Sequence, residues 1–127
     1  MKRTFIIHPL PDTYAICRLE AEEKVPQWAL MSRIMFMART DQELSFICCQ
    51  EHVPDAVRAD RGWCGFRVQG PFPLNEIGVL ASVLEPLAQA GVSILATSTF
   101  DTDYFFVPMA KEKDAKKALL MAGHRIE

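Results

Sequence analysis

The sequence has no block of basic residues and no long hydrophobic run, and both absences limit its possible partners. Its 14 Lys and Arg are outnumbered by 16 Asp and Glu, so the formal net charge is -2. No basic cluster could neutralise several phosphates, which argues against nucleic acid and anionic membrane. No apolar stretch approaches the roughly 18 residues that span a bilayer. The N-terminus has only three consecutive apolar residues, Phe5 to Ile7, too few for a signal peptide. We therefore expect a soluble, cytoplasmic protein.

Metal-binding and nucleophilic signatures are also scarce. The four cysteines sit inside apolar segments, as reduced thiols used as small core residues do; they are Cys17, Cys48, Cys49 and Cys64. A zinc site built from Cys48, Cys49, Cys64 and His52 is an alternative, but adjacent cysteines in a strand point to opposite faces and no C-x-x-C pair completes the set. A nucleophilic pair of Cys64 with His52 or His124 has no local signature. We favour core thiols and expect no metal and no cofactor.

Half of the 127 residues are hydrophobic, which is enough for one domain or two very small ones. In the first half, β-like runs at residues 4–7 and 14–19 flank the turn-rich stretch around Pro9 and Pro11. Pro26 favours a short helix with Trp28, Leu30 and Met31 inward. Further strands are expected at 36–38 and 44–49, and a short helix at 54–58.

The second half has a clearer pattern. A strand is expected at 63–68, then a loop at 70–73 that contains two prolines and a glycine. Residues 75–90 have the strongest helical pattern, with Ile77, Leu80, Val83, Leu84 and Leu87 on one face. Pro86 predicts a kink in this helix near Ser82. Gly91 can end the helix as a left-handed cap. A second helix at 111–122, with Ala115, Ala118, Leu119 and Met121 inward, precedes a short C-terminal segment.

The most informative stretch is 93–108. Apolar runs at 94–97 and 104–107 predict two strands joined by the polar corner 98–103. The two halves repeat this pattern about 59 residues apart, since 36–40 and 44–48 correspond to 95–99 and 103–107. We therefore predict an α+β fold of two ferredoxin-like units, residues 1–61 and 62–127, each with an antiparallel sheet covered by helices on one face.

The corner and the strongest helix could hold a zwitterion. Backbone N–H groups at the start of the 75–90 helix suit a carboxylate, and Gly78 allows a ligand to approach the backbone. Asp101 or Asp103 suits an ammonium group. The alternative is that Asn75 only caps the helix and the two aspartates are ordinary turn residues. Aromatic residues along the strands are expected in the core, whereas Phe100 and Phe72 could stack on a ligand.

The residues Asn75-Glu76-Ile77-Gly78-Val79-Leu80, with Ser98-Thr99-Phe100-Asp101-Thr102-Asp103 after the helix, resemble the ACT domain, a small ligand-sensing βαββαβ module. More narrowly, they are similar to tandem ACT proteins related to the CASTOR arginine sensor and to the regulatory region of aspartate kinases. Ile77 replaces a proline that often precedes the glycine in such loops, and the first half has no Gly-Val-Leu motif.

The resemblance implies amino-acid binding where ACT units meet, with contacts from the loop before the helix and from the strands. It implies seven ligand-binding residues: Asn75, Glu76, Ile77, Gly78, Thr99, Phe100 and Asp103. The expected protein is a non-enzymatic, amino-acid-binding regulator, a homo-oligomer with a regulated protein partner. One alternative is an interaction module with no small-molecule ligand. Another is a small enzyme with Asp101 or Asp103 as general base, although no His, Lys or metal cluster accompanies them.

Overall fold

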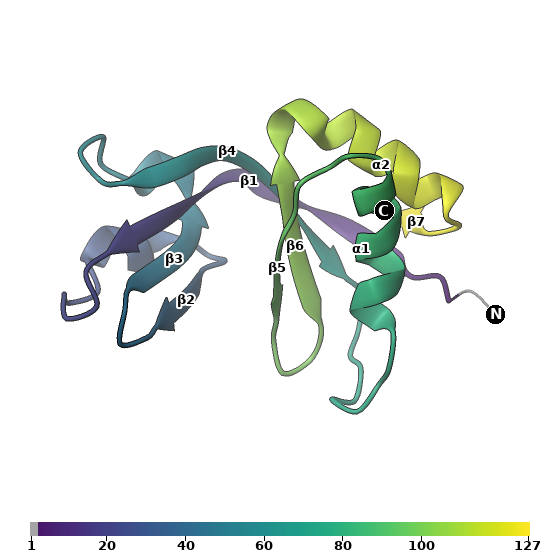
Figure 1. Ribbon diagram of the computed structural model, residues 1–127, viewed down its shortest axis with the longest axis horizontal. Helices are drawn as coiled ribbons and strands as arrows, with labels where there is room; N and C mark the ends of the chain where they lie inside the picture. Colours follow the sequence, from purple (N-terminus) through teal and green to yellow (C-terminus); the bar gives the residue numbers. More distant parts are fainter. Residues whose placement is uncertain (1–2) are drawn as a thin grey trace. The chain divides into compact units, whose positions relative to one another are not determined.

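The computed structural model describes residues 3–127, which divide into two compact units. The larger unit combines the chain as far as Pro11 with Cys64–Glu127, and the smaller unit is Asp12–Trp63. Two long strands, β1 (Ile6–Leu19) and β4 (Ala59–Val68), contribute residues to both units (Figure 1). The start of the chain, which the sequence pattern assigned to the first half, therefore lies in the larger unit.

Strand β1 replaces the two separate strands expected at 4–7 and 14–19, so the predicted turn between them was wrong. Pro9 and Pro11 are two residues apart, so their missing N–H groups point to the same side of the strand. Along the edge of β1 opposite β4, residues 6–7 pair with β7 (Arg125–Ile126) and residues 14–19 pair with β3 (Leu44–Cys49). Pro9 and Pro11 lie between these two paired segments. Their missing N–H groups therefore cost the sheet no hydrogen bond between strands.

The larger unit contains the predicted β-α-β-β-α-β order. Strand β4 leads to helix α1 (Val79–Gln89), strands β5 (Leu95–Ser98) and β6 (Asp103–Pro108), the 3-10 turn η3 (Met109–Lys111), helix α2 (Glu112–Met121) and strand β7. Neighbouring strands are in the order β7-β1-β4-β6-β5, so the beginning of β1 adds a strand between β7 and β4. The two predicted strands of 93–108 and their antiparallel pairing are confirmed.

Both helices pack on one face of this sheet (Figure 1). Alternate residues of the strands, including Phe66, Val68, Phe105 and Val107, meet the buried helix residues Val79, Val83, Leu87, Ala115 and Leu119. Three residues of the predicted apolar faces do not belong to this core. Leu80 is half-buried in the first turn of α1, Ile77 is 87% exposed because it precedes α1, and Met121 is exposed at the last residue of α2.

Pro86 lies inside α1, as expected, and its consequence is visible in the hydrogen bonding. A proline has no N–H, so the carbonyl of Ser82, one turn earlier, lacks its helical donor. The His124 ring supplies one instead, with Nε2 2.9 Å from the Ser82 oxygen. Nδ1 of the same ring accepts the backbone N–H of Phe5 at 3.1 Å, which assigns the ring proton to Nε2. His124 is 2% exposed and joins the chain start, α1 and the segment before β7.

The smaller unit contains β2 (Phe36–Arg39), β3 and the adjoining parts of β1 and β4, in the order β2-β3-β1-β4. The strands expected at 36–38 and 44–49 are confirmed. In place of helices, residues 12–63 contain two 3-10 turns, η1 (Gln27–Met31) and η2 (Gln50–His52). The helix expected at 54–58 is therefore wrong, and Leu30 and Met31 are exposed rather than inward, because only Ala29 of η1 is buried.

The core of the smaller unit consists of Ala15, Cys17, Ala29, Leu44, Phe46, Cys48 and Val53. Trp28 meets the Phe46 ring edge-on, with ring centroids 5.7 Å apart. Across residues 3–127, no helix is long and apolar enough to cross a membrane. The α+β fold with a mainly antiparallel sheet and two α-helices agrees with the sequence prediction, while the ferredoxin-like helices occur in the larger unit.

Candidate functional site

A cleft of about 270 Å³ lies in the larger unit where the segment before α1 faces the β5–β6 corner. One wall is the stretch 72–81, which leads into the first turn of α1, and the other is the corner 98–103. Both walls come from the stretches that carry the ACT resemblance. The lining residues with polar side chains are Glu76, Ser98, Thr99, Asp101, Thr102 and Asp103.

Gly78 sets the geometry of the helix wall. Its φ of 84° lies in the left-handed region, and it is the N-terminal cap residue of α1. A Cβ at this position would meet nothing within 4 Å, so the backbone conformation and not space favours glycine. The helix therefore begins at Val79, four residues later than the pattern from Asn75 indicated, and Asn75 is not its cap.

The first turn of α1 presents open backbone donors. No side chain caps it, and the first N–H groups of any helix lack helical acceptors. The ladder starts with the Ser82 N–H, which donates to the Gly78 oxygen at 3.1 Å. Val79, Leu80 and Ala81, the residues before it, all line the cleft. This wall is thus a site of partial positive charge where an anionic group can bind.

Thr99 organises the opposite wall. Its N–H donates to the Thr102 oxygen at 2.8 Å, and its Oγ1 accepts the Thr102 N–H at 3.2 Å, which closes a tight corner. Ser98 and Asp103 are paired across the β5–β6 ladder, and Ser98 Oγ donates to Asp103 Oδ1 at 2.5 Å. The Ser98 hydroxyl thus holds one carboxylate oxygen and orients the Asp103 side chain at the mouth of the corner.

A backbone hydrogen bond connects the two walls. The Phe72 N–H donates to the Asp101 oxygen at 2.8 Å, and a Cβ at Gly70 would lie 2.8 Å from that same oxygen. Gly70 therefore allows the loop to approach the corner. The side chain of Thr102 adds a second connection, because its Oγ1 donates to the Val68 oxygen in β4. The loop before α1, the corner and β4 are consequently connected by hydrogen bonds to backbone carbonyl oxygens.

Three carboxylates belong to this cleft, but they are not equivalent. Glu76 forms an ion pair with Arg3, so its charge is already balanced. Asp101 and Asp103 lie on the corner, and no cation is paired with either among the described residues. None of the described residues that line the cleft is His, Lys or Cys. The arrangement places an electropositive helix end opposite two carboxylates, which suits a ligand carrying both charges.

Five of the seven predicted ligand-binding residues line this cleft: Glu76, Gly78, Thr99, Phe100 and Asp103. Asn75 and Ile77 do not. Ile77 instead lines a separate groove of about 680 Å³ between α1 and α2. Ser98 and Thr102 were not identified from the sequence. The pairing of Ser98 with Asp103 across a four-residue corner was the available signal, because opposite residues in a hairpin face each other.

Cys17, Cys48 and Cys64 differ in their surroundings. Cys17 and Cys48 are buried in the smaller unit, as core thiols should be. Cys64 lies in β4 and its Sγ donates to the Val107 oxygen at 3.6 Å, while both ring nitrogens of His124 are occupied elsewhere. Burial raises the pKa of the Cys64 thiol to about 11, which opposes thiolate formation. A nucleophilic pair of Cys64 with His124 is therefore wrong.

Comparisons with known proteins agree with this architecture. A family model of the ACT domain matches residues 58–120, and a second family model, described as an N-terminal domain, matches residues 12–56. A protein from Agobacterium tumefaciens of known crystal structure is 37% identical, with a TM-score of 0.93 over 98% of this chain and 93% of that chain. No curated protein sequence matches the chain.

More distant structures share the fold. A protein of unknown function from Vibrio cholerae, described as a possible transport protein, is 17% identical, with a TM-score of 0.74 over 94% of this chain and 90% of that chain. The regulatory subunit of aspartate kinase from Thermus flavus is 13% identical, with a TM-score of 0.65 over 96% of this chain and 99% of that one.

Proposed function

Because the chain belongs to the ACT domain family, we propose that it is a non-enzymatic regulatory protein whose larger unit binds a free amino acid or a similar small zwitterion. One observation carries the proposal. An uncapped helix N-terminus and two carboxylates face each other across a single cleft. In this proposal the smaller unit is a degenerate ACT-like unit, with 3-10 turns in place of helices.

The carboxylate of the ligand binds at the first turn of α1. Backbone N–H groups of Val79, Leu80 and Ala81 supply the donors, and the helix dipole adds typically 0.3–1 kcal/mol for a negative group at this end. Gly78 supports this contact because its left-handed backbone starts the helix here without a capping side chain. The site needs no basic residue, and none lines the cleft among the described residues.

The ammonium group of the ligand binds at the corner. Asp103 is the preferred partner because Ser98 holds one of its oxygens and leaves the other for a charge-assisted hydrogen bond, which is roughly twice as strong as a neutral one. Asp101 lines the same cleft and adds negative charge. Glu76 contributes less, since Arg3 already neutralises it.

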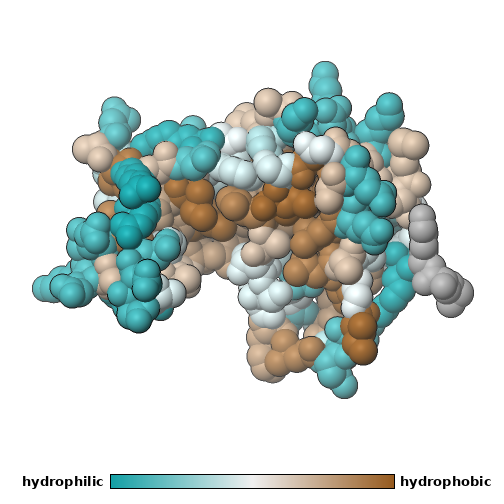
Figure 2. Space-filling model, in the orientation of Figure 1, coloured by the Kyte–Doolittle hydropathy of each residue, from teal (hydrophilic) through white to brown (hydrophobic). Residues whose placement is uncertain are grey.

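The volume of about 270 Å³ lies just below the roughly 300–1,000 Å³ of drug-sized ligand pockets, so a small amino acid is the preferred size class. The cleft is also edged by exposed apolar side chains. Leu74 and Phe100 are 73% and 79% exposed. Figure 2 shows hydrophobic surface at the tips of the loop before α1 and of the β5–β6 hairpin.

This apolar rim supports a homo-oligomer in which a second copy covers the cleft and reads its occupancy. Ligand binding would stabilise one arrangement of the copies by differential affinity, and a regulated protein partner would respond to that population. The same rim also supports the second candidate function, an interaction module that binds a protein through Leu74 and Phe100 and takes no small molecule. The four free thiols fit a reducing, cytoplasmic location.

A thermal-shift screen against the free amino acids tests the proposal. A ligand that binds only the folded protein at 100 times its Kd stabilises it by about 2.7 kcal/mol, which is a shift of several degrees in Tm. We expect a selective shift with one amino acid or a small set of related ones. A flat response to all of them, with no heat on calorimetric titration, would favour the interaction module.

Two variants connect the response to the cleft. Asp103→Asn keeps an oxygen for the Ser98 hydroxyl but removes the charge, so it should fold normally and lose the ligand-induced shift. Asp41→Asn is the matched control, because Asp41 lies in the corresponding corner of the smaller unit. A shift that persists in Asp103→Asn, or disappears equally in Asp41→Asn, would contradict the site assignment.

A further inference from the structure

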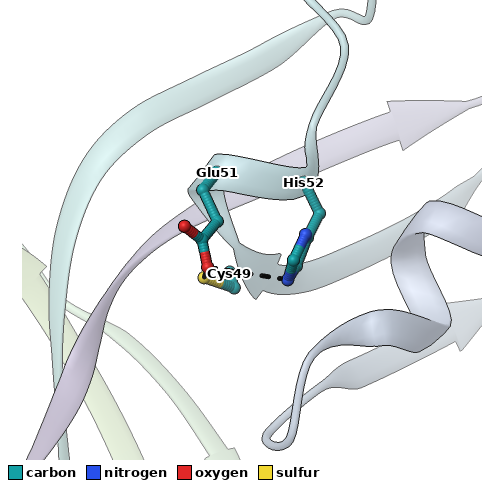
Figure 3. Close-up of side chains that lie close together, drawn as sticks. All are labelled: Cys49, Glu51 and His52. Atoms are coloured by element: carbon teal, nitrogen blue, oxygen red, sulfur yellow. Dashed lines mark hydrogen bonds and ion pairs between the residues drawn. The ribbon is translucent and has the colours of Figure 1, made fainter.

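A second cluster of ligand-type side chains lies in the smaller unit, at the end of β3. Cys49 Sγ is 3.6 Å from Glu51 Oε1, and His52 Nε2 is 3.8 Å from that same oxygen. All three ligand atoms lie within 4.8 Å of one another, and this is the one group of three such residues that residues 3–127 bring together. Figure 3 shows the three side chains converging on one point.

The local fold explains why these side chains meet. In a 3-10 helix there are three residues per turn, so residues three apart in the sequence lie on the same side. Cys49 is the N-terminal cap residue of η2, and His52 is its last residue. The Val53 N–H donates to the Gln50 oxygen at 3.1 Å, which fixes the turn. The backbone therefore places the sulfur and the imidazole together, and Glu51 between them reaches the same point.

The position of Cys49 is also held from outside the turn. Its N–H donates to Ser32 Oγ, and the residue is paired with Tyr14 in the β1–β3 ladder. Cys49 is buried, the His52 side chain is 25% exposed, and the Glu51 side chain is 74% exposed. The cluster is thus closed on the side of the sulfur and open to solvent on the side of the carboxylate.

The distances from Glu51 Oε1 to the other two ligand atoms are close to those around a tetrahedral transition-metal ion. With Zn–S near 2.3 Å and Zn–N or Zn–O near 2.0–2.1 Å, tetrahedral angles place S and O about 3.6 Å apart and N and O about 3.4 Å apart. The observed sulfur-to-oxygen distance of 3.6 Å meets the first value. The nitrogen-to-oxygen distance of 3.8 Å is longer than the second value, and the Glu51 side chain is 74% exposed, so burial does not fix its carboxylate.

The charges around the sulfur also favour a cation. The carboxylates of Asp12 and Glu51 both lie close enough to interact electrostatically with the Cys49 sulfur. A divalent ion stabilises the thiolate and is itself attracted by the two carboxylates. Mixed sulfur, nitrogen and oxygen ligands suit Zn²⁺ better than Mg²⁺ or Ca²⁺, which take oxygen ligands.

We propose that Cys49, Glu51 and His52 form a zinc site in the smaller unit, with solvent in the fourth position. The expectation of no metal rested on a four-residue set that included Cys48 and Cys64. Cys48 belongs to the core, and Cys64 belongs to the other unit. The signal that was missed is the spacing C-x-E-H directly after a strand.

Cobalt(II) titration of the reduced, chelator-treated protein tests the site. A thiolate-to-cobalt charge-transfer band in the near ultraviolet should saturate at one ion per chain, and Zn²⁺ should displace it whereas excess Mg²⁺ should not. Cys49→Ser should abolish the band. His52→Gln and Glu51→Gln, at more exposed positions, should weaken Co²⁺ binding by more than about tenfold.

Matched controls remove the same groups from elsewhere in the chain. Cys64→Ser removes a thiol and His8→Gln removes an imidazole outside the cluster, so both should bind Co²⁺ as the wild type does. Thermal unfolding in chelator confirms that each variant folds, and added Zn²⁺ should raise Tm for the wild type but not for Cys49→Ser. Absence of the band in the wild type, or its survival in Cys49→Ser, would overturn the proposal.

Discussion

Replacing His124 by leucine should destabilise the protein through two backbone groups that lose their partner. The ring accepts the Phe5 N–H at 3.1 Å and donates to the Ser82 oxygen at 2.9 Å. A buried polar group left unsatisfied costs about 1–3 kcal/mol. Leucine roughly fills the volume, so the polar loss dominates. Because Ser82 is half-buried and lines the groove between α1 and α2, water can partly replace the lost donor, and we expect a total loss of about 2–4 kcal/mol.

A second substitution, at Pro86 in α1, separates the contribution of the Ser82 carbonyl from that of the Phe5 N–H. In Pro86→Ala the new N–H can reach the Ser82 oxygen, as in any regular helix. Removal of the imidazole then leaves only Phe5 without a partner. His124→Leu should therefore cost about 1 kcal/mol less in the Pro86→Ala background than in the wild type.

Urea unfolding of the wild type, the two single variants and the double variant measures this coupling. His8→Leu is the control, since His8 is not buried in the core and its loss should cost less than about 1 kcal/mol. Costs that add within about 0.5 kcal/mol would show that His124 does not replace the donor that Pro86 lacks.

Three further predictions follow from single positions. Gly65→Ala should cost about 1–3 kcal/mol in urea unfolding, because a Cβ there would lie 2.6 Å from the Phe106 ring; a smaller cost would mean that the ring can move. Burial raises the pKa of the Cys64 thiol from 9.0 in the unfolded chain to about 11 in the folded protein. The unfolded chain therefore loses the thiol proton at a lower pH than the folded protein does. As the pH rises from 9.0 to about 11, the free energy of unfolding should fall by about 2 kcal/mol. Cys64→Ser should reduce this fall, and an unchanged pH dependence would contradict it. Phe100→Ser should leave the free energy of unfolding within about 0.5 kcal/mol while weakening self-association in sedimentation, and unaltered association would exclude Phe100 from the interface.

The sequence predicted the helices and the β5–β6 hairpin of the larger unit because their signals are local. The apolar residues within 79–89 recur at helical spacing, and two short apolar runs flank the corner 98–103. Both patterns are local, so the helix and the hairpin were predicted. The start of α1 was misplaced because Ile77 continues the apolar spacing and Asn75 is a residue type that often caps a helix, whereas the left-handed backbone of Gly78 decides where the helix begins.

The remaining differences depend on contacts between distant parts of the chain. Pro9 and Pro11 indicate a turn locally, yet both prolines fit one strand because its partners on that side pair elsewhere. In the same way, the hydrogen bond from Phe72 to Asp101 that fixes the cleft joins residues that no local pattern connects. The cluster at Cys49 and His52 depends on a 3-10 turn, whose three-residue period a search for helices and strands does not detect.

Amide NMR tests most directly whether an amino acid binds in the cleft between the first turn of α1 and the corner 98–103. The amino acid that gives the largest thermal shift is added to labelled protein, and chemical shifts of the backbone amides are followed. If the ligand binds in the cleft, the largest changes will fall on the first turn of α1, residues 79–81, and on the corner 98–103. Saturable changes concentrated elsewhere, or the absence of any amino acid that produces them, would contradict binding in this cleft.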